Sequence, residues 1–339
     1  MSQRRAEDVE RKGGAVWRLA FGVWRSRCLL RLPAREAMLG ALIASAGLTI
    51  AVAGYQAPQA PHVAEIEKVK DGLYLITGGG GNTSAFITDN GVVVIDTKLK
   101  GWGQAILTKI KSVTDKPVTM IINTHTHWDH TGSNADFPAT VDFVAQENTK
   151  INMAKETCTV VGNCGAFTGE NRKYLPKRTF KDKMSLLSGK DRIDLYYFGP
   201  GHTNGDAIVV FAALRTAHLA DLFARKAVPN VMPSDGGSAV RLPETLGKVV
   251  AGIKDVDTVI TGHSTTMTWQ ELQEFAAFNR DFLSSVQAAM RAGKTVDEAA
   301  AAQQALAGKY KGYTIDPAKT KENTRYIYDE LHLSGRYVP

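Results

Sequence analysis

The alternation of apolar and polar positions divides the chain from residue 62 onward into short strands and a few helices. Two apolar segments flank Asp71-Gly72, a dipeptide that strongly indicates the turn of a β-hairpin. Between Trp102 and Val113, apolar residues recur every three or four positions, which predicts a helix that stops before Pro117. The expected strands are 64–69, 73–76, 83–88, 92–95, 118–122, 193–198, 207–211, 217–220 and 256–260.

The order of these elements predicts an α/β fold. Hairpins and a helix occur in the first half, and a similar series with a helix over 243–253 follows in the second half. This repetition favours two packed sheets with helices outside, an αββα sandwich. From Thr268 the pattern is helical, with further helical stretches near 296–307 and 323–333. We therefore expect a catalytic domain over 62–265 and a helical C-terminal extension over 266–339, packed on the same domain.

Residues 1–53 have the layout of a targeting segment. Basic residues precede an apolar stretch that begins at Met38, and Ala51-Val52-Ala53 is a small-x-small cleavage site. This order predicts a secretory signal peptide, with an uncleaved membrane anchor as the alternative. The segment holds nine basic and four acidic side chains, which leaves only +2 of the net charge of +7 for the remaining chain. We expect an exported, periplasmic protein whose basicity does not indicate a nucleic-acid partner.

The compartment bears on the cysteines, of which the chain has 3. Cys158 and Cys164 lie in a loop-like stretch, and in an oxidising compartment they are expected to form a disulfide. Free thiols are the alternative. Metal ligation is disfavoured because the neighbourhood supplies too few further ligands.

Three of the eight histidines fall within six residues, in the sequence His125-Thr126-His127-Trp128-Asp129-His130. A chance occurrence of H-x-H-x-D-H in a chain of this composition is on the order of 10⁻⁴. The motif directly follows a predicted strand, so its side chains emerge from a tight loop at a sheet edge. Imidazole nitrogens and a carboxylate oxygen are ligands suited to Zn²⁺.

Three later positions extend this ligand set. His202, Asp221 and His263 each lie where a predicted strand meets a loop, so all three can converge on one rim. His62, His218 and His332 match no motif and are expected to be surface or packing residues.

The ordered set resembles the metallo-β-lactamase superfamily, whose signature is H-x-H-x-D-H followed by a histidine, a bridging Asp or Cys, and a final histidine. The match covers roughly residues 62–265. The resemblance implies two Zn²⁺ ions. One would be held by His125, His127 and His202, and the other by Asp129, His130 and His263. Asp221 would bridge the two. The resemblance also implies that Asp96, at the end of its strand, braces the histidine loop from behind.

The resemblance further implies a hydrolase. Two zinc ions ~3.5–4 Å apart share a water and lower its pKa toward ~7, and the resulting hydroxide attacks a carbonyl carbon. Asp129 or Asp221 would orient that water and shuttle its proton. The expected substrate is a small molecule with an ester, lactone, thioester or lactam bond. Candidate substrate contacts are Trp128, Arg225, Lys226 and Asn82.

Several alternatives stay open at this point. A zinc β-lactamase proper is one, although such enzymes with two occupied sites often carry Cys at the position of Asp221. A redox di-iron centre of the superfamily usually has Glu at the middle position of the motif, so His127 argues against it, whereas a single-iron sulfur dioxygenase stays open. A non-catalytic zinc-binding protein would be expected to have lost ligands. A nuclease would need a large insertion between His130 and His202.

Overall fold

The computed structural model describes residues 62–157 and 164–333 of the chain. The predicted leader and Cys158 lie outside the described residues. All described residues belong to one compact unit.

The first sheet contains seven strands among the described residues, and they are hydrogen-bonded in chain order. They are β1 (Glu65–Lys70), β2 (Leu73–Thr77), β3 (Thr83–Thr88), β4 (Gly91–Ile95), β5 (Val118–Asn123), β6 (Asp142–Gln146) and β7 (Arg178–Phe180). Strands β1 to β4 run antiparallel, whereas β4, β5, β6 and β7 are parallel. The carboxyl ends of β4 and β5 therefore open on the same sheet edge, where Asp96 and the histidine motif follow them.

The second sheet contains six strands of the described chain in the order β13-β12-β11-β10-β9-β8. They are β8 (Lys183–Leu186), β9 (Ile193–Tyr196), β10 (Ile208–Phe211), β11 (Thr216–Ala220), β12 (Thr258–Thr261) and β13 (Met267–Thr268). Only β11 and β12 pair in parallel. Their parallel pairing brings Asp221 and His263, which follow them, to one edge.

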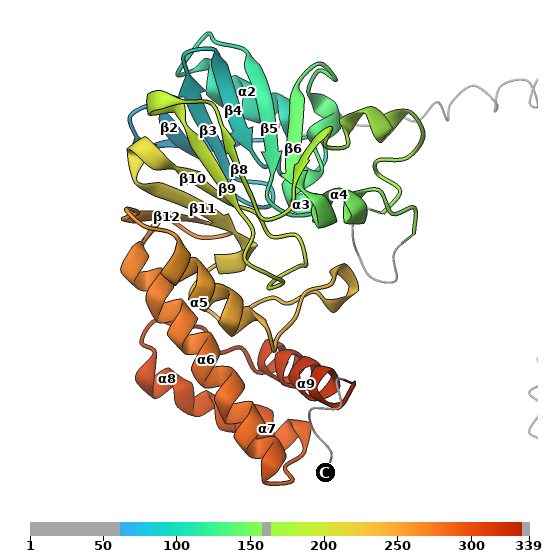
Figure 1. Ribbon diagram of the computed structural model, residues 1–339, viewed down its shortest axis with the longest axis vertical. Helices are drawn as coiled ribbons and strands as arrows, with labels where there is room; N and C mark the ends of the chain where they lie inside the picture. Colours follow the sequence, from blue (N-terminus) through green and yellow to red (C-terminus); the bar gives the residue numbers. More distant parts are fainter. Residues whose placement is uncertain (1–61, 158–163, 334–339) are drawn as a thin grey trace, which may run out of the picture. The chain divides into compact units, whose positions relative to one another are not determined.

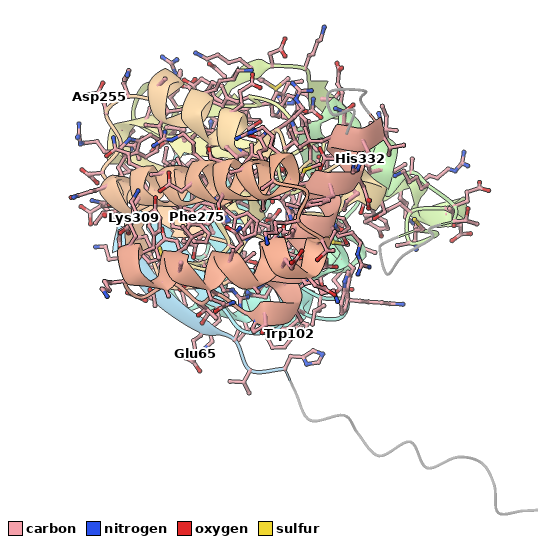
Figure 2. The ribbon with its side chains drawn as sticks, turned by 90° about the horizontal axis from the view of Figure 1, so that it is seen from below. Glu65, Trp102, Asp255, Phe275, Lys309 and His332 are labelled. Atoms are coloured by element: carbon pink, nitrogen blue, oxygen red, sulfur yellow. The ribbon has the colours of Figure 1, made fainter. Side chains whose placement is uncertain are left out.

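The helices are α2 (Gly103–Lys111), α3 (Trp128–Thr131), α4 (Glu147–Met153), α5 (Leu242–Gly252), α6 (Trp269–Arg291), α7 (Val296–Ala302), α8 (Leu306–Lys309) and α9 (Pro317–Leu333). Figure 1 shows the second sheet between the first sheet and the C-terminal helices. Figure 2 views those helices face on, with Phe275 on the long helix α6. Among the described residues, no helix is both long and apolar enough to cross a membrane.

Three apolar clusters fill the spaces between these layers. Side chains of both sheets, among them Phe86 and Phe211, pack face to face in the middle. Ile106 and Ile110 of α2 cover the outer face of the first sheet. Helices α5 and α6 cover the outer face of the second sheet through residues such as Phe275, and α9 adds Ile327 to the same apolar cluster, which is removed from water. The predicted αββα sandwich is confirmed, and the C-terminal helices share the core of its second sheet.

The differences from the predicted elements are local. Most strand ends agree within one to three residues, but β6, β7, β8 and β13 were not predicted. The helix expected near 296–307 is divided into α7, a 3₁₀ turn at Gln303–Ala305, and α8. Short or partly polar strands such as β7 carry little period-two pattern and are specified by their sheet neighbours instead.

Candidate metal centre

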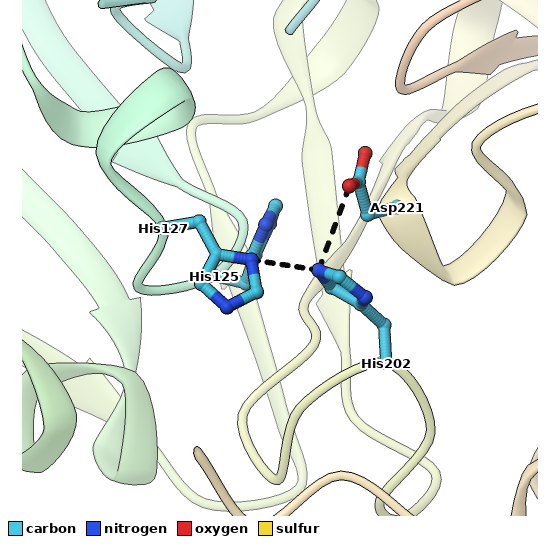
Figure 3. A group of neighbouring side chains, drawn as sticks. All are labelled: His125, His127, His202 and Asp221. Atoms are coloured by element: carbon cyan, nitrogen blue, oxygen red, sulfur yellow. Dashed lines mark hydrogen bonds and ion pairs between the residues drawn. The ribbon is translucent and has the colours of Figure 1, made fainter. Parts of the chain in front are cut away.

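Four of the predicted ligands lie together at the common edge of the two sheets. His125, His127, His202 and Asp221 each offer a ligand atom, and these atoms lie within 4.8 Å of one another. Figure 3 shows the imidazole of His202 between those of the histidine motif and the Asp221 carboxylate. His202 Nε2 lies 2.8 Å from His127 Nδ1 and 3.5 Å from Asp221 Oδ2. We call this group the first cluster.

The other three predicted ligands form a second cluster: Asp129, His130 and His263. His263 Nε2 lies 3.3 Å from Asp129 Oδ2 and 3.4 Å from His130 Nε2. The short helix α3 begins just after His127 and carries Asp129 and His130. A single loop thus supplies ligand atoms to both clusters.

Asp221 faces both clusters with different oxygens. Its Oδ2 is directed at His202, whereas its Oδ1 lies 3.1 Å from His263 Nε2 and 3.4 Å from His130 Nε2. Ala220, just before it, has φ 45°, a conformation that costs a residue with a β-carbon about 1–3 kcal/mol. A β-carbon at Gly262 would lie 2.0 Å from Asp221 Oδ1, so the absent side chain leaves room for the carboxylate.

Asp96 braces the histidine loop from behind. The buried carboxylate accepts hydrogen bonds from the backbone N–H of Thr124 at 2.8 Å and from its hydroxyl at 2.7 Å. Asp96 Oδ2 also lies 2.7 Å from His130 Nδ1, which leaves Nε2 of that ring toward the second cluster. A carboxylate behind a metal-ligating histidine selects the tautomer and orientation of its ring.

Two braces in the first cluster have no signal in the sequence. His127 Nε2 lies 3.2 Å from Asp235 Oδ2, and His202 Nδ1 donates to the backbone carbonyl of Asn230. Both partners belong to a loop without apolar periodicity, and one of them acts through its backbone. Sequence patterns therefore do not distinguish them from ordinary loop residues.

The glycines before Asn82 pack beneath the second cluster. The N–H of Gly81 donates to Asp129 O at 2.9 Å, and a β-carbon on Gly81 would lie 2.2 Å from the His130 ring. The fully buried ammonium of Lys98 donates to Gly81 O at 2.7 Å, and burial lowers the pKa of Lys98 to about 7. The glycine loop before Asn82 therefore packs against the loop that carries Asp129 and His130 and supports it.

The electrostatics of the two clusters keep Asp221 and His125 in the deprotonated states that metal ligands need, whereas His130 holds a proton in the absence of a metal ion. Burial opposes ionisation of Asp221, but His130 and the other imidazoles outweigh it and hold the pKa of that carboxyl well below its usual value. Burial, together with neighbouring imidazoles, lowers the pKa of His125 far below normal. Burial also disfavours charge on His130, yet Asp221 and Asp96 outweigh it and raise the pKa of His130. A cation bound here would displace that proton.

The donor set fits divalent metal ions. No hydrogen bond reaches two buried atoms of the first cluster, His125 Nε2 and Asp221 Oδ1. A buried polar atom without a partner costs free energy unless something else binds it. Five imidazoles and two carboxylates, with ligand atoms gathered into two clusters, match the nitrogen and oxygen ligands of zinc sites.

The clusters open into a cavity of about 500 Å³. Its lining includes the predicted ligands Asp129, Asp221 and His263 and the predicted substrate contacts Trp128 and Arg225. Val228, Met232 and Phe275 add apolar surface, while Thr314, Asp316 and Lys319 come from the C-terminal extension. Sequence analysis did not predict that the extension reaches this cavity.

The other two predicted substrate contacts, Asn82 and Lys226, do not line this cavity. Asn82 is buried and donates both amide hydrogens, to Thr261 O at 2.8 Å and to Ser264 O at 2.7 Å. The Lys226 ammonium lies 2.9 Å from Glu271 and 3.4 Å from Glu274 of α6. These findings contradict the expected substrate contacts, because Asn82 secures the loop that carries His263 and Lys226 anchors α6.

Cys164 is disulfide-bonded. Its predicted partner Cys158 lies outside the described residues, so the pairing stays a prediction.

Comparisons with known proteins agree with this geometry. The model of the metallo-beta-lactamase superfamily matches residues 76–281. The chain is 30% identical over 190 residues to the metallo-beta-lactamase type 2 of Elizabethkingia meningoseptica, which covers 51% of this chain and 67% of that protein. It is 26% identical over 239 residues to the 2,4-dinitroanisole O-demethylase subunit alpha of Nocardioides sp. (strain JS1661), covering 68% of this chain and 67% of the relative.

Solved structures share the fold. A metallo-beta-lactamase from Pontibacter korlensis superposes with a TM-score of 0.54 at 21% identity, covering 64% of this chain and 99% of that one. The stereoselective inverting sec-alkylsulfatase Pisa1 from Pseudomonas sp. gives a TM-score of 0.62 at 16% identity, over 79% of this chain and 50% of that one. Because the family model spans more than half of the chain and these structures share its fold, the chain belongs to the metallo-β-lactamase superfamily.

Proposed function

We propose that the chain is an exported dinuclear zinc hydrolase that cleaves a carbonyl C–O, C–S or C–N bond in a small molecule. The observation that carries this proposal is the position of Asp221, whose two oxygens face two separate clusters of ligand atoms. A single-metal centre needs no carboxylate directed at two clusters. Export is proposed from the basic and apolar pattern of residues 1–53, which lie outside the described residues.

His125, His127 and His202 would hold one ion, Asp129, His130 and His263 the other, and Asp221 both. Such a pair of ions supplies an activated water and polarises the substrate carbonyl. Asp221 Oδ1 and Asp129 Oδ2 lie beside the same atom, His263 Nε2, at 3.1 and 3.3 Å. Either carboxylate is therefore placed to orient a water between the clusters and to accept its proton.

The cavity wall favours a substrate with an apolar part and an anionic group. Trp128 is 45% exposed, which leaves much of its ring available for contact. Arg225 lines the same cavity and is exposed. We propose that Arg225 binds a substrate carboxylate while the apolar residues contact the remainder.

A zinc β-lactamase is the second candidate. The observation that favours it is the 30% identity to the metallo-beta-lactamase type 2 of Elizabethkingia meningoseptica. Against it, Asp221 stands where many such enzymes with two zinc ions have Cys. The two candidates make different predictions for turnover of a β-lactam.

The first test measures zinc content by inductively coupled plasma mass spectrometry and hydrolysis of a substrate panel on the same full-length protein. The panel holds nitrocefin, a homoserine lactone, S-lactoylglutathione, p-nitrophenyl acetate and a secondary alkyl sulfate. We expect about two zinc ions per chain and turnover of at least one carbonyl substrate. Turnover of nitrocefin above the others would favour the β-lactamase.

The variant Asp221→Ala should bind no more than one zinc and lose at least about 100-fold in kcat/KM, because it removes the shared ligand. The matched control is Asp297→Ala, which removes an exposed carboxylate paired with Lys321. Two tightly held zinc ions and unchanged turnover in Asp221→Ala would refute the bridging role. Iron in place of zinc, or hydrolysis of the alkyl sulfate alone, would refute the carbonyl hydrolase.

A further inference from the structure

Two of the three histidines in the first cluster are oriented by one loop. Asn230 supplies the carbonyl that accepts from His202 Nδ1, and Asp235 supplies the carboxylate beside His127 Nε2. We call residues 226–239, which contain both partners, the bracing segment. The backbone of this segment also meets His202 directly, because the N–H of Met232 donates to His202 O at 2.9 Å.

The bracing segment is held from outside the two sheets, by the C-terminal extension. Thr314 pairs with its first residues, accepting from the N–H of Val228 at 3.1 Å and donating to Lys226 O at 3.0 Å. At its other end, the Glu330 carboxylate of α9 accepts from the N–H of Ala239 at 2.7 Å. The C-terminal extension thus contacts the segment on both sides of the atoms that brace the histidines.

Asn323 of α9 makes the contact nearest to His202. Its side chain is 1% exposed, and its amide donates to Pro229 O at 2.8 Å and to Lys319 O at 2.9 Å. Both neighbours are acceptors, so the amide nitrogen and not the oxygen must face them. Pro229 directly precedes Asn230, whose carbonyl accepts the hydrogen bond from His202 Nδ1. Lys319 Nζ adds a contact to Asn230 Oδ1 at 3.2 Å.

The second cluster is supported differently. His130 is braced by Asp96, and the loop of His263 is secured by Asn82, both of which belong to the first half of the chain. Neither of these two supporting residues belongs to α9.

We infer that Asn323 and helix α9 act as positioning elements for the first cluster alone, and so set the zinc affinity of one of the two sites. This inference rests on the proposed dinuclear centre. An isosteric change of Asn323 to Asp places a carboxylate oxygen where a donor faced Pro229 O, and the repulsion would displace the bracing segment. Loss of an outer partner of a metal-ligating histidine typically weakens metal binding by about 10–100-fold.

The test is a zinc titration of full-length, metal-free protein against a chromophoric chelator. Asn323→Asp is measured in two backgrounds that leave one cluster each, Asp129→Ala for the first and His202→Ala for the second. We expect the variant to weaken zinc binding about 10–100-fold in the Asp129→Ala background and less than about twofold in the His202→Ala background. The matched control is Tyr326→Phe, which removes a hydrogen bond within α9, from the Tyr326 hydroxyl to Glu322, without touching the bracing segment.

Equal weakening in both backgrounds would overturn the inference, because a merely structural role would affect both clusters alike. Unchanged affinity in both backgrounds would overturn it too. Urea unfolding monitors whether each variant is folded. If Asn323→Asp does not fold, Lys319→Met is measured in the same backgrounds and should show a smaller loss in the first cluster only. A wild-type chain that binds no zinc would instead refute the proposed function.

Discussion

Acid should destabilise this protein partly through a histidine that binds no metal in the proposed site. His218 lies on β11 between the two sheets, is fully buried, and has its Nδ1 2.8 Å from the hydroxyl of Ser84 on β3. Its Nε2 has no hydrogen-bond partner. Burial lowers the pKa of His218 from 6.5 to about 4, an effect that the nearby Asp96 only partly opposes.

The sign follows from which state binds the proton. Between pH 6.5 and about 4 the unfolded chain protonates His218 while the folded chain does not, so stability is lost as the pH falls through this window. The pKa difference between the folded and unfolded chain corresponds to about 3 kcal/mol of unfolding free energy, of which about 2 kcal/mol is lost between pH 7 and pH 5. Below pH ~4 both states carry the proton and no further loss arises from this residue.

The assay is urea unfolding of the metal-free full-length chain at pH 7 and pH 5, so that release of zinc does not contribute. His218→Asn retains a hydrogen-bonding group near the Ser84 hydroxyl and cannot titrate. Between pH 7 and pH 5, we expect the unfolding free energy of the wild-type chain to fall by about 2 kcal/mol more than that of this variant. The control His62→Asn changes an exposed histidine and should behave as wild type. Equal losses in wild type and His218→Asn would refute the reasoning.

Two further predictions concern the ligand loop and the leader. Gly81→Ala should lower the free energy of unfolding by about 1–3 kcal/mol and weaken zinc binding in the second cluster, because its β-carbon would meet the His130 ring. The control is Gly247→Ala in α5, where a β-carbon would meet no atom within 4 Å, so this change should be neutral or stabilising. Chelator titration and urea unfolding measure both, and wild-type zinc affinity in Gly81→Ala would contradict the packing argument. Protein recovered from the periplasm should have the intact mass of a chain beginning at Gly54, and a full-length mass would contradict cleavage after Ala53.

The chemistry of the site was largely predictable from the sequence because its residue types are rare and closely spaced. His125, His127, Asp129 and His130 occupy one loop, and a strand directly before that loop is enough to place them at a sheet edge. The order of His202, Asp221 and His263 behind further strands predicted the rest of the set. The structure brings all seven residues together. The apolar periodicity of Ile106 and Ile110 likewise predicted a helix on the outer face of a sheet.

Substrate contacts were predicted less well. The prediction that Asn82 and Lys226 contact substrate rested on their nearness in sequence to a glycine run and to Asp221, respectively. Their partners, Thr261 O and Glu271, are set by packing between segments far apart in the chain. Nearness in sequence gives no information about which way such a side chain turns.

Tertiary structure alone decided how the ligands are oriented and what encloses them. Asp235 and Asn230 brace histidines of the first cluster across sequence separations of 108 and 28 residues, and Asn323 holds Pro229, beside Asn230, across 94 residues. His218, which matches no motif, acquires a strongly lowered pKa only because two sheets close over it. Local patterns record which face of an element is apolar, but hydrogen bonds between distant loops and the burial of a polar group arise only when the layers pack.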